Sequence, residues 1–311
     1  MSIVIPAYNE AGRLAASLPG LRDRIALSAR VELIVVDDGS EDATAEVALE
    51  HLRDWPASKL VRLPWNQGKG AAVRAGVSLA TGDAVVFMDA DLSADLADLP
   101  QLLKALNHAD IAVGSRQVAG SCATYDRRLR RVTSKVFNDV ACAIAGIAVS
   151  DTQCGFKAFR MPAAKLLFHL SQVDGFAFDV EVLVLADLLG FRVVEVPVGW
   201  QEAAGSRVRP WRDALWMLRD ILLARRRCVR AARGANLNEW VSEPRTIGPP
   251  VAKANGAHTP VPCAQRAGAP ELVIDLRDPA STAGRSRADV LVRSHSVHLA
   301  SVPAALDHHG R

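Results

Sequence analysis

Two aspartates at the end of an apolar run are the residues of this sequence best placed to do chemistry. The run 84–88 is continuously apolar, and Asp89 and Asp91 follow it, separated by one alanine. Residues two apart in an extended chain point the same way, so both carboxylates can reach one point beyond the run. Two bare carboxylates repel each other, and a divalent cation carrying a diphosphate would relieve the repulsion. The pattern therefore predicts that Asp89 and Asp91 bind Mg²⁺ or Mn²⁺ together with a phosphorylated substrate.

The same Asp-x-Asp pattern also has a purely structural explanation. Aspartate is favoured at the start of helices, so the pair could open a loop or cap the helix that follows. The pair alone does not separate these two explanations. The rest of the chain must decide between them.

An alternation of apolar runs and helical patterns surrounds the acidic pair. Short runs typical of buried parallel strands lie at 2–6, 33–36, 59–63, 84–88 and 111–113. Between them, leucine, valine and alanine recur at helical spacing. This alternation predicts an α/β fold with a parallel sheet covered by helices. Ligands bind such sheets beyond the carboxyl ends of the strands, where the acidic pair is expected.

Polar or charged residues follow each of the five predicted strands. They are Tyr8 and Glu10, Asp37 and Asp38, Lys69, Asp89 and Asp91, and Arg116. Turn chemistry explains any one of these loops. It does not explain why all five end this way, including the lysine and arginine that a diphosphate needs.

Length and composition narrow the class of protein. A chain of 311 residues, 50% apolar, predicts one large domain with an appendage. The net charge of +3 is too small to indicate nucleic-acid binding. Five cysteines make an odd number, which favours a reducing compartment over a disulfide framework. Cys154 is expected to be a small buried apolar residue. None of the eight histidines lies in a motif, so histidine is not expected to bind the metal.

Any membrane contact is expected to come from the surface of the protein. No apolar run reaches the length of a spanning helix, and the first predicted strand begins almost at the first residue, which leaves no room for a signal peptide. The segment 211–224 is amphipathic, and Arg225, Arg226 and Arg227 follow it, a combination that suits an anionic membrane surface. Residues 235–311 are predicted to be a mostly disordered tail, because their composition has only scattered apolar residues.

Five motifs, taken in order, resemble those of the family 2 glycosyltransferases with the GT-A nucleotide-sugar fold. They lie at 5–10, 36–40, 66–70, 89–91 and 114–116. The resemblance covers residues 1 to about 225, so we expect a GT-A domain over 1–225 and a basic, mostly disordered tail over 226–311. A non-catalytic protein that kept only the sheet would not need the acidic pair, Lys69 and Arg116 together.

Three later motifs, at 151–157, 178–181 and 195–200, resemble those of the dolichyl-phosphate β-glucosyltransferases. The resemblance implies transfer of glucose from UDP-glucose to a dolichyl or other polyprenyl phosphate, with inversion and a Mg²⁺ or Mn²⁺ ion. We expect the protein to be cytoplasmic and to associate peripherally with the cytoplasmic face of a membrane. The alternatives are a mannosyltransferase that uses GDP-mannose and a GT-A protein that acts on another acceptor.

The same resemblance implies roles for single residues. The nucleoside would be held by Pro6, Tyr8, Glu10 and Asp38, with Lys69 near the donor and Ala90 beside the metal ligands Asp89 and Asp91. Arg116 would face the phosphate groups, and Arg127, Arg130, Arg131 and Arg207 the acceptor phosphate. Ser93 stands where some relatives carry a longer polar side chain, so a third protein ligand to the metal is not implied.

Two further expectations concern the chemistry. The acceptor phosphate is already an anion, so no strong general base is required, and positioning by arginines can supply much of the effect. Glu181 is left open between a partner for an arginine and a catalytic group.

Overall fold

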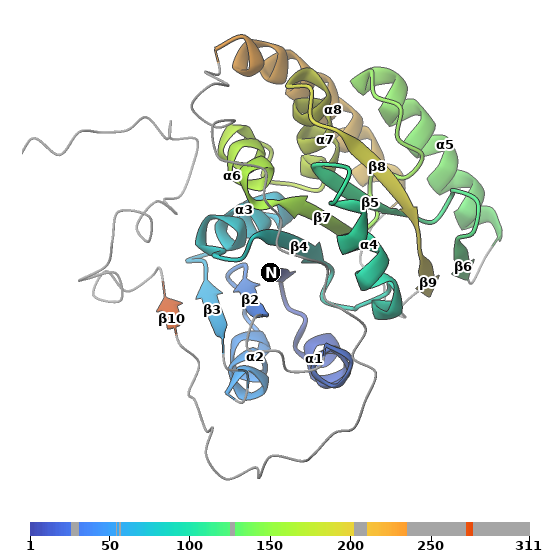
Figure 1. Cartoon of the computed structure of the whole chain (residues 1–311). Helices are drawn as coiled ribbons and strands as arrows, with labels where there is room; N and C mark the ends of the chain where they lie inside the picture. The colour runs from blue at the N-terminus through green and yellow to red at the C-terminus, as the bar shows by residue number, and fades with distance from the viewer. Residues whose placement is uncertain are drawn as a thin grey trace, which may run out of the picture.

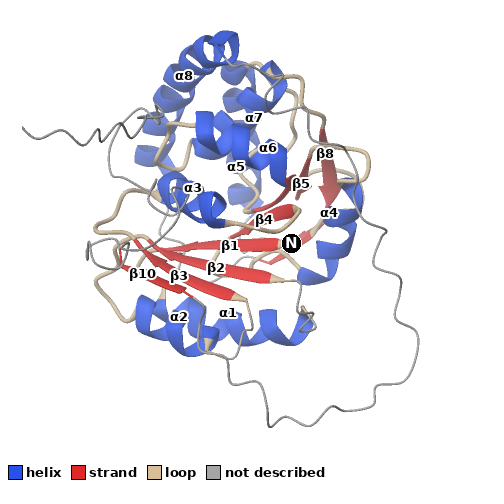
Figure 2. Ribbon diagram, turned by 60° about the vertical axis from the view of Figure 1, so that its left-hand side comes forward, coloured by secondary structure: helices blue, strands red, loops and turns tan. Residues whose placement is uncertain are grey.

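An eight-stranded sheet with helices on both faces forms the centre of the computed structural model (Figures 1 and 2). The structure describes residues 1–25, 31–53, 55, 57–124, 128–201, 210–234 and 272–275, and for 128–132, 134, 210–216, 230–234 and 272–275 it describes the backbone alone. The strand order is β10-β3-β2-β1-β4-β7-β5-β8. The predicted α/β fold with a mostly parallel sheet is confirmed.

The elements alternate along the chain as the apolar pattern predicts. The strands are β1 (Ser2–Ala7), β2 (Glu32–Asp37), β3 (Ser58–Arg62), β4 (Ala84–Met88), β5 (Ile111–Ser115), β6 (Cys122–Thr124), β7 (Phe156–Arg160), β8 (Val193–Pro197), β9 (Gly199–Gln201) and β10 (Leu272–Asp275). The helices are α1 (Ala11–Arg24), α2 (Thr44–Leu52), α3 (Lys69–Leu79), α4 (Leu99–Ala105), α5 (Arg128–Ala145), α6 (Met161–Leu170), α7 (Phe178–Leu188) and α8 (Pro210–Gly234), and a short 3-10 turn (Leu96–Asp98) precedes α4.

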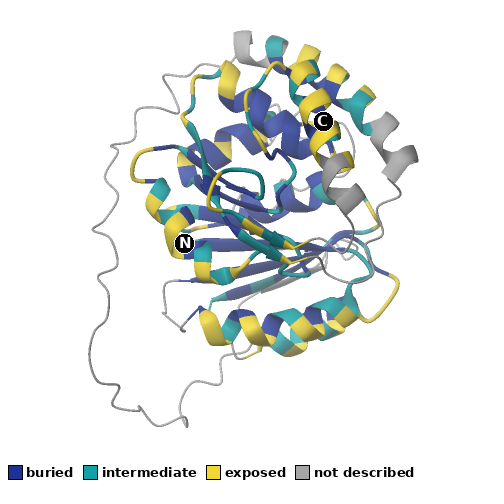
Figure 3. Cartoon of the chain, turned by 90° about the vertical axis from the view of Figure 1, so that its right-hand side faces the viewer, coloured by how far each residue is buried: buried dark blue, intermediate teal, exposed yellow. Residues whose placement is uncertain are grey.

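Each face of the sheet carries its own apolar core. Helices α1, α2 and α4 cover one face, and α3, α6 and α7, backed by α5 and α8, cover the other. All six residues of β1 and all six of β2 are buried, because strands covered on both faces have no solvent side. Figure 3 shows the consequence, with buried strands inside and exposed residues along the outer sides of the helices.

Strand β7 is a central strand of the sheet that the apolar pattern did not predict. It lies between β4 and β5 and runs antiparallel to both. Its first residue, Phe156, pairs with Met88, the last residue of β4. The amino end of β7 therefore meets the carboxyl ends of β1, β2, β4 and β5 at one edge of the sheet, and the loop before β7 joins the loops that carry the predicted site.

The small sheet of β6 and β9 extends this edge. Its two strands are parallel, with Ala123 opposite Trp200. β9 also holds the segment after the acidic pair, because the Gln201 amide donates to the Ser93 carbonyl at 2.9 Å and the Asp95 amide donates to the Gly199 carbonyl at 2.8 Å. Trp200 is thereby fixed beside the end of β4.

Two elements of the structure cross or lie beyond the domain boundary predicted at residue 225. Helix α8 continues to Gly234, so the boundary predicted at residue 225 falls inside a helix. Strand β10, from the segment predicted as a tail, is the outermost strand of the sheet and pairs in parallel with β3, with Leu272 opposite Lys59. None of the helices in the described part of the chain combines the length and apolarity that crossing a membrane requires.

Candidate active site

The acidic pair lies where the sequence places it, in the loop that leaves β4. Asp89 extends the ladder with β7, since its amide donates to the Gly155 carbonyl at 3.1 Å. Three residues after Asp89, the chain turns at Leu92, which has a φ of 46°. Asp91 stabilises this turn by accepting the Ser93 amide at 3.0 Å. Both side chains are only partly buried, so a ligand can approach them from solvent.

Lys69 contacts the acidic pair directly. Its Nζ lies 2.7 Å from Asp89 Oδ1, and it also lies 5.2 Å from the centre of the Phe87 ring. Burial works against the charge on Lys69, but Asp89 and the nearby Asp179 outweigh it and raise the pKa of the ammonium group. The lysine predicted to lie near the donor thus holds a positive charge against the first aspartate.

Two backbone amides in the first turn of α3 are already hydrogen-bonded to another loop. The amides of Gly70 and Ala71 both donate to the Asp174 carbonyl, at 2.7 Å and 3.3 Å. A Cβ on Gly70 would come within 2.3 Å of the Val173 carbonyl oxygen, so the close approach of the two loops requires glycine there. These two amides are therefore not available to a phosphate, whereas the Lys69 side chain reaches the acidic pair.

Arg116 follows β5 and is held by Asp151. Its Nε donates to Asp151 Oδ2 at 2.7 Å, and a terminal nitrogen donates to Oδ1 at 2.8 Å. The Arg116 amide donates to the same carboxylate at 2.9 Å. The guanidinium also lies 5.1 Å from the centre of the Trp200 ring. This fork fixes the orientation of the arginine at the edge of the sheet.

The loops predicted to hold the nucleoside are interlocked. The Asn9 amide donates to Ser40 Oγ at 2.8 Å, and the Glu10 amide donates to Thr44 Oγ1 at 2.8 Å. Asn9 has a φ of 52°, and its Oδ1 accepts the Glu41 amide at 2.9 Å. The loops after β1 and β2 therefore form one rigid surface.

Individual residues of this predicted nucleoside surface have further contacts. Pro6 is buried within β1, whereas Tyr8 lies partly exposed at its end. The Glu10 carboxylate pairs with Arg13 at 2.7 Å. The Ala90 carbonyl accepts a hydrogen bond from Ser17 Oγ at 2.7 Å, which ties the acidic pair to α1.

Asp38 holds the glycine-rich turn. Its two carboxylate oxygens accept the amides of Gln67 and Gly68, each at 2.8 Å. Burial raises the pKa of Asp38 to about 6, against the lowering effect of these two donors. Asp38 thus positions the turn into α3, which adds a structural role to the predicted nucleoside contact.

The raised pKa of Asp38 predicts a pH-dependent contribution to stability. The folded state binds this proton more tightly than the unfolded state, so its contribution is greatest below the unfolded pKa and declines as the pH rises to about 6. After a discount for partial solvation, the unfolding free energy of the protein minus that of Asp38→Asn should fall by about 1–2 kcal/mol between about pH 4 and about pH 7. Urea unfolding of both proteins measures this difference. Parallel pH profiles would show that Asp38 titrates normally.

Several predicted residues are not tested by this geometry. Arg127 and Arg207 lie outside the described residues, and of Arg130 and Arg131 the structure gives the backbone alone, in the first turn of α5. Their assignment to the acceptor phosphate stays a prediction.

The structure also shows the surroundings of Cys154 and Glu181, whose roles the sequence analysis considered. Cys154 is 1% exposed, and burial raises its pKa to about 12, which confirms a packing role. Glu181 is 1% exposed, and its Oε2 accepts the amides of Gln172 and Val173 at 2.9 Å and 2.8 Å. Its carboxylate thus holds the loop that packs against the start of α3.

The sequence reasoning assigned no role to five residues that build the site. They are Asp151, Gly155, Lys157, Asp179 and Trp200. All five lie in the motifs at 151–157, 178–181 and 195–200, so the motifs marked the right segments. Their pairing with Arg116 and with the loop after β4 depends on the antiparallel β7, which the apolar pattern did not predict.

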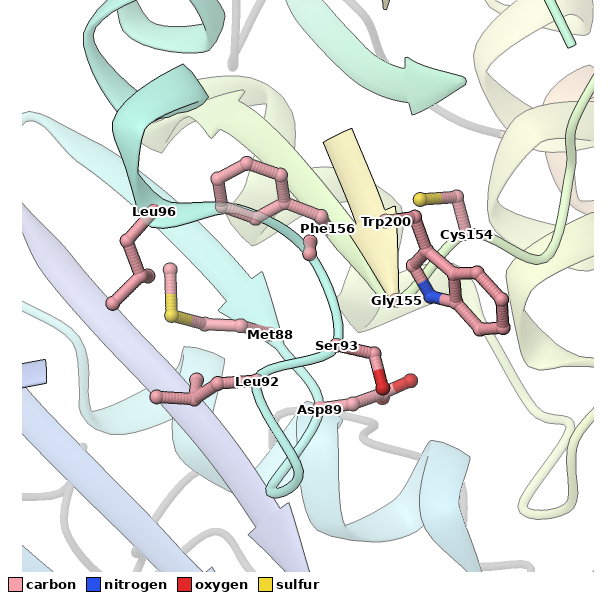
Figure 4. Close-up of a pocket in the computed structure, with 10 residues that line it drawn as sticks. Met88, Asp89, Leu92, Ser93, Leu96, Cys154, Gly155, Phe156 and Trp200 are labelled. Carbon is pink, nitrogen blue, oxygen red and sulfur yellow. The ribbon is translucent and has the colours of Figure 1, made fainter. Parts of the chain in front are cut away.

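A small recess opens beside Asp89 (Figure 4). Its walls are mainly apolar and include Leu92, Phe156 and Trp200. Ser93 lies close to Asp89 in this view, and its Oγ is buried without a hydrogen-bond partner among the described residues. The acidic pair therefore borders both solvent and an apolar wall.

The donor set at the acidic pair fits a hard divalent cation that is shared with a diphosphate. Among the described residues, no group of three or more histidine, cysteine, aspartate or glutamate side chains could hold a metal ion. Asp89 and Asp91 supply carboxylate oxygens, which Mg²⁺ and Mn²⁺ prefer, and the paired ammonium of Lys69 shows that positive charge is favoured at Asp89. Two protein ligands leave most coordination positions for phosphate oxygens and water.

Comparisons with known proteins agree with this geometry. Residues 2–168 match the family model described as "Glycosyl transferase family 2". The chain is similar to the dolichyl-phosphate beta-glucosyltransferase of Drosophila melanogaster, 37% identical over 239 residues that cover 72% of this chain and 73% of that protein. The corresponding Homo sapiens protein is 33% identical over 248 residues, which cover 75% of this chain and 76% of that protein.

A solved structure has the same arrangement of elements. It is the crystal structure of glucosyl-3-phosphoglycerate synthase from Mycobacterium tuberculosis in complex with Mn²⁺, uridine-diphosphate and phosphoglyceric acid. The TM-score is 0.54 and the sequences are 25% identical, over 73% of this chain and 78% of that chain. The expected GT-A architecture is thereby confirmed.

Proposed function

The chain belongs to glycosyl transferase family 2, and from this premise we propose that it transfers glucose from UDP-glucose to a polyprenyl phosphate. The observation that carries the proposal is the grouping of Asp89, Asp91, Lys69 and Arg116 at one edge of the sheet. The two carboxylates can bind a divalent cation, and the two positively charged side chains can bind phosphate. Together they form the charge pattern that a nucleoside diphosphate needs. The curated relatives act on dolichyl phosphate, which supports the choice of acceptor.

The proposed mechanism assigns each group to one part of the donor. The interlocked loops after β1 and β2 hold the nucleoside, and Lys69 and Arg116 face the diphosphate. Asp89 and Asp91 would hold a Mg²⁺ or Mn²⁺ ion, which when bound offsets the charge that grows on the leaving diphosphate. Because Asp151 orients Arg116 in advance, little reorganisation is needed as this charge develops.

The acceptor phosphate needs positioning more than activation. It is an anion before the reaction, so it can attack the anomeric carbon directly, with inversion of configuration. The basic residues Arg127, Arg130, Arg131 and Arg207 are proposed to align it. No protein base is assigned, and the buried Glu181 remains bound to its loop.

A donor and acceptor panel with the purified full chain tests this proposal. With Mn²⁺ present, calorimetry should show that UDP binds more tightly than GDP, and UDP-glucose should yield a lipid-linked sugar with a short polyprenyl phosphate. Tighter binding of GDP would favour the mannosyltransferase alternative. Product with 3-phosphoglycerate, but not with the lipid, would favour an acceptor like that of the Mycobacterium tuberculosis enzyme.

We also propose that the protein docks on the cytoplasmic face of a membrane through α8 and the adjacent α5. On α8, Ile221, Ala224 and Cys228 pack inward, so much of its apolar side is used by the fold. Leu222, however, is 45% exposed, and on α5 Val136 is 56% exposed and Val140 is 41% exposed. Exposed apolar side chains beside basic residues suit an anionic lipid surface.

The three arginines of α8 are not equivalent in this respect. Arg225 donates to the Ile144 carbonyl at 2.9 Å and so caps the end of α5. Arg226 and Arg227 are exposed. A test of membrane binding should therefore leave Arg225 unchanged.

Replacing Arg226 and Arg227 with serine should weaken binding to anionic liposomes by about 30-fold, at about 1 kcal/mol for each arginine. The effect should shrink as salt is added, because the attraction is screened. Liposome flotation measures it. The matched control is Arg53→Ser with Lys104→Ser, two exposed basic residues on the opposite face, the first directly after α2 and the second on α4. Equal flotation of the two double variants would show that α8 serves only to pack on the domain.

A further inference from the structure

The carboxylate of Asp89 lies against a glycine. A Cβ on Gly155 would come within 2.0 Å of Asp89 Oδ2 and within 2.6 Å of Oδ1. The backbone of Gly155 also accepts the Asp89 amide at 3.1 Å. The position of Asp89 therefore depends on where the backbone of residues 154–155 lies and on the absence of a side chain at 155.

A buried ion pair holds this backbone in place. Lys157 Nζ donates to the Cys154 carbonyl at 2.7 Å and lies 2.5 Å from Asp179 Oδ1. Lys157 is 2% exposed and Asp179 is 4% exposed. The pair joins β7 to α7 and fixes the loop that immediately precedes β7.

The buried pair of Lys157 and Asp179 also lies close to the contact between Lys69 and Asp89. Lys157 and Lys69 both lie near the Phe87 ring, at 5.5 Å and 5.2 Å from its centre. Asp179 acts on Lys69 as well as on Lys157, so positive and negative charges alternate from the interior to the acidic pair. Replacing Lys157 or Asp179 would thus affect the position of Asp89 through the backbone of residues 154–155, and its electrostatic surroundings through Lys69.

Stability alone gives little reason for such a pair. The cost of removing two charges from water often equals or exceeds their attraction, so an apolar pair of similar size would serve packing as well. What an apolar pair could not do is donate a hydrogen bond to the Cys154 carbonyl.

We propose that Lys157 and Asp179 are positioning residues that, with Gly155, set the Asp89 carboxylate for the metal–diphosphate. The inference rests on the proposed function in taking Asp89 as a ligand of that group. These residues need not touch the substrate, since they act through the backbone of 154–155.

Two variants of the full chain test this role without leaving a buried charge unpaired. Lys157→Met with Asp179→Asn removes both charges and keeps the side-chain sizes similar. Gly155→Ala places a methyl group where the Asp89 carboxylate now lies. The matched control is Lys59→Met with Glu32→Gln. That ion pair also lies 2.5 Å apart and is largely buried, but it lies at the opposite edge of the sheet.

The readouts are the affinity for Mn²⁺ in the presence of UDP, measured by the electron paramagnetic resonance of free Mn²⁺, and thermal melting. We expect both test variants to lose about 10–100-fold in Mn²⁺ affinity, as when residues that orient a metal ligand are removed. The control should keep its affinity even where its melting temperature falls. If the double variant does not fold, Gly155→Ala, which retains both charges, decides.

The outcomes separate the two hypotheses. Wild-type Mn²⁺ affinity in the folded test variants would overturn the positioning role and leave the proposed function standing. An equal loss in the control would also overturn it, since the effect would then reflect general destabilisation. A wild-type protein that binds no Mn²⁺ with UDP would overturn both.

Discussion

Replacing Asp91 with asparagine should lower turnover by about 10²–10³-fold and leave the fold intact. Asp91 is only partly buried, and asparagine can still accept the Ser93 amide through its Oδ1. The variant therefore loses the charge and keeps the turn. Metal-dependent rates and thermal melting of the same preparation measure both effects.

Asp89→Asn should have a similar effect on the rate, with an added loss of the ion pair with Lys69. The double variant should cost less than the sum of the two single changes, because both carboxylates act through one ion. The alternative, that the pair only caps the next helix, predicts a stability loss of about 1 kcal/mol with normal kinetics. In the structure it is Asp95 whose side chain caps the following turn, by accepting the Ala97 amide. Normal turnover in both single variants would remove the metal site from the mechanism.

Arg116→Lys should lower turnover by about 10²-fold although the charge is kept. A lysine cannot form the two parallel bonds that Arg116 makes with Asp151, so its ammonium would not be aimed as the guanidinium is. The loss of a hydrogen bond should cost only about 1 kcal/mol of stability, which melting can monitor.

Arg160→Lys is the matched control for this change. Arg160 ends β7 at the opposite edge of the sheet, where its Nε donates to the Ala109 carbonyl. We expect a similar change in stability and normal turnover. Equal kinetics in the two lysine variants would mean that Arg116 contributes to folding and not to transfer.

Much of the sheet could be predicted from the sequence because local pattern determines it. β1, β2, β4 and β5 each contain a continuous apolar run, and polar residues follow each run. The parallel arrangement then brings Asp38, Asp89 and Arg116 to one edge. These inferences need only hydrophobic periodicity and the rule for ligand sites in open sheets.

What could not be predicted depends on contacts between distant segments. β7 carries Lys157, whose full burial is possible only because Asp179 lies beside it. A lysine within a short strand gives no sign of this in a single sequence. The partner of Arg116 was missed for the same reason, since Asp151 reaches Arg116 only once β7 lies between β4 and β5.

Strand β10 has a consequence for any shortened form of the protein. Residues 235–311 are predicted to be dispensable for chemistry, and a chain that ends at Gly234 should keep its turnover. That chain would also lack β10, and the outer backbone amides and carbonyls of β3 would lose the partners they have in the sheet. An uncovered strand edge is a template for pairing with another chain. The shortened protein would therefore be prone to self-association through β3. We expect aggregation that increases with protein concentration, and not a loss of catalysis, as its first sign.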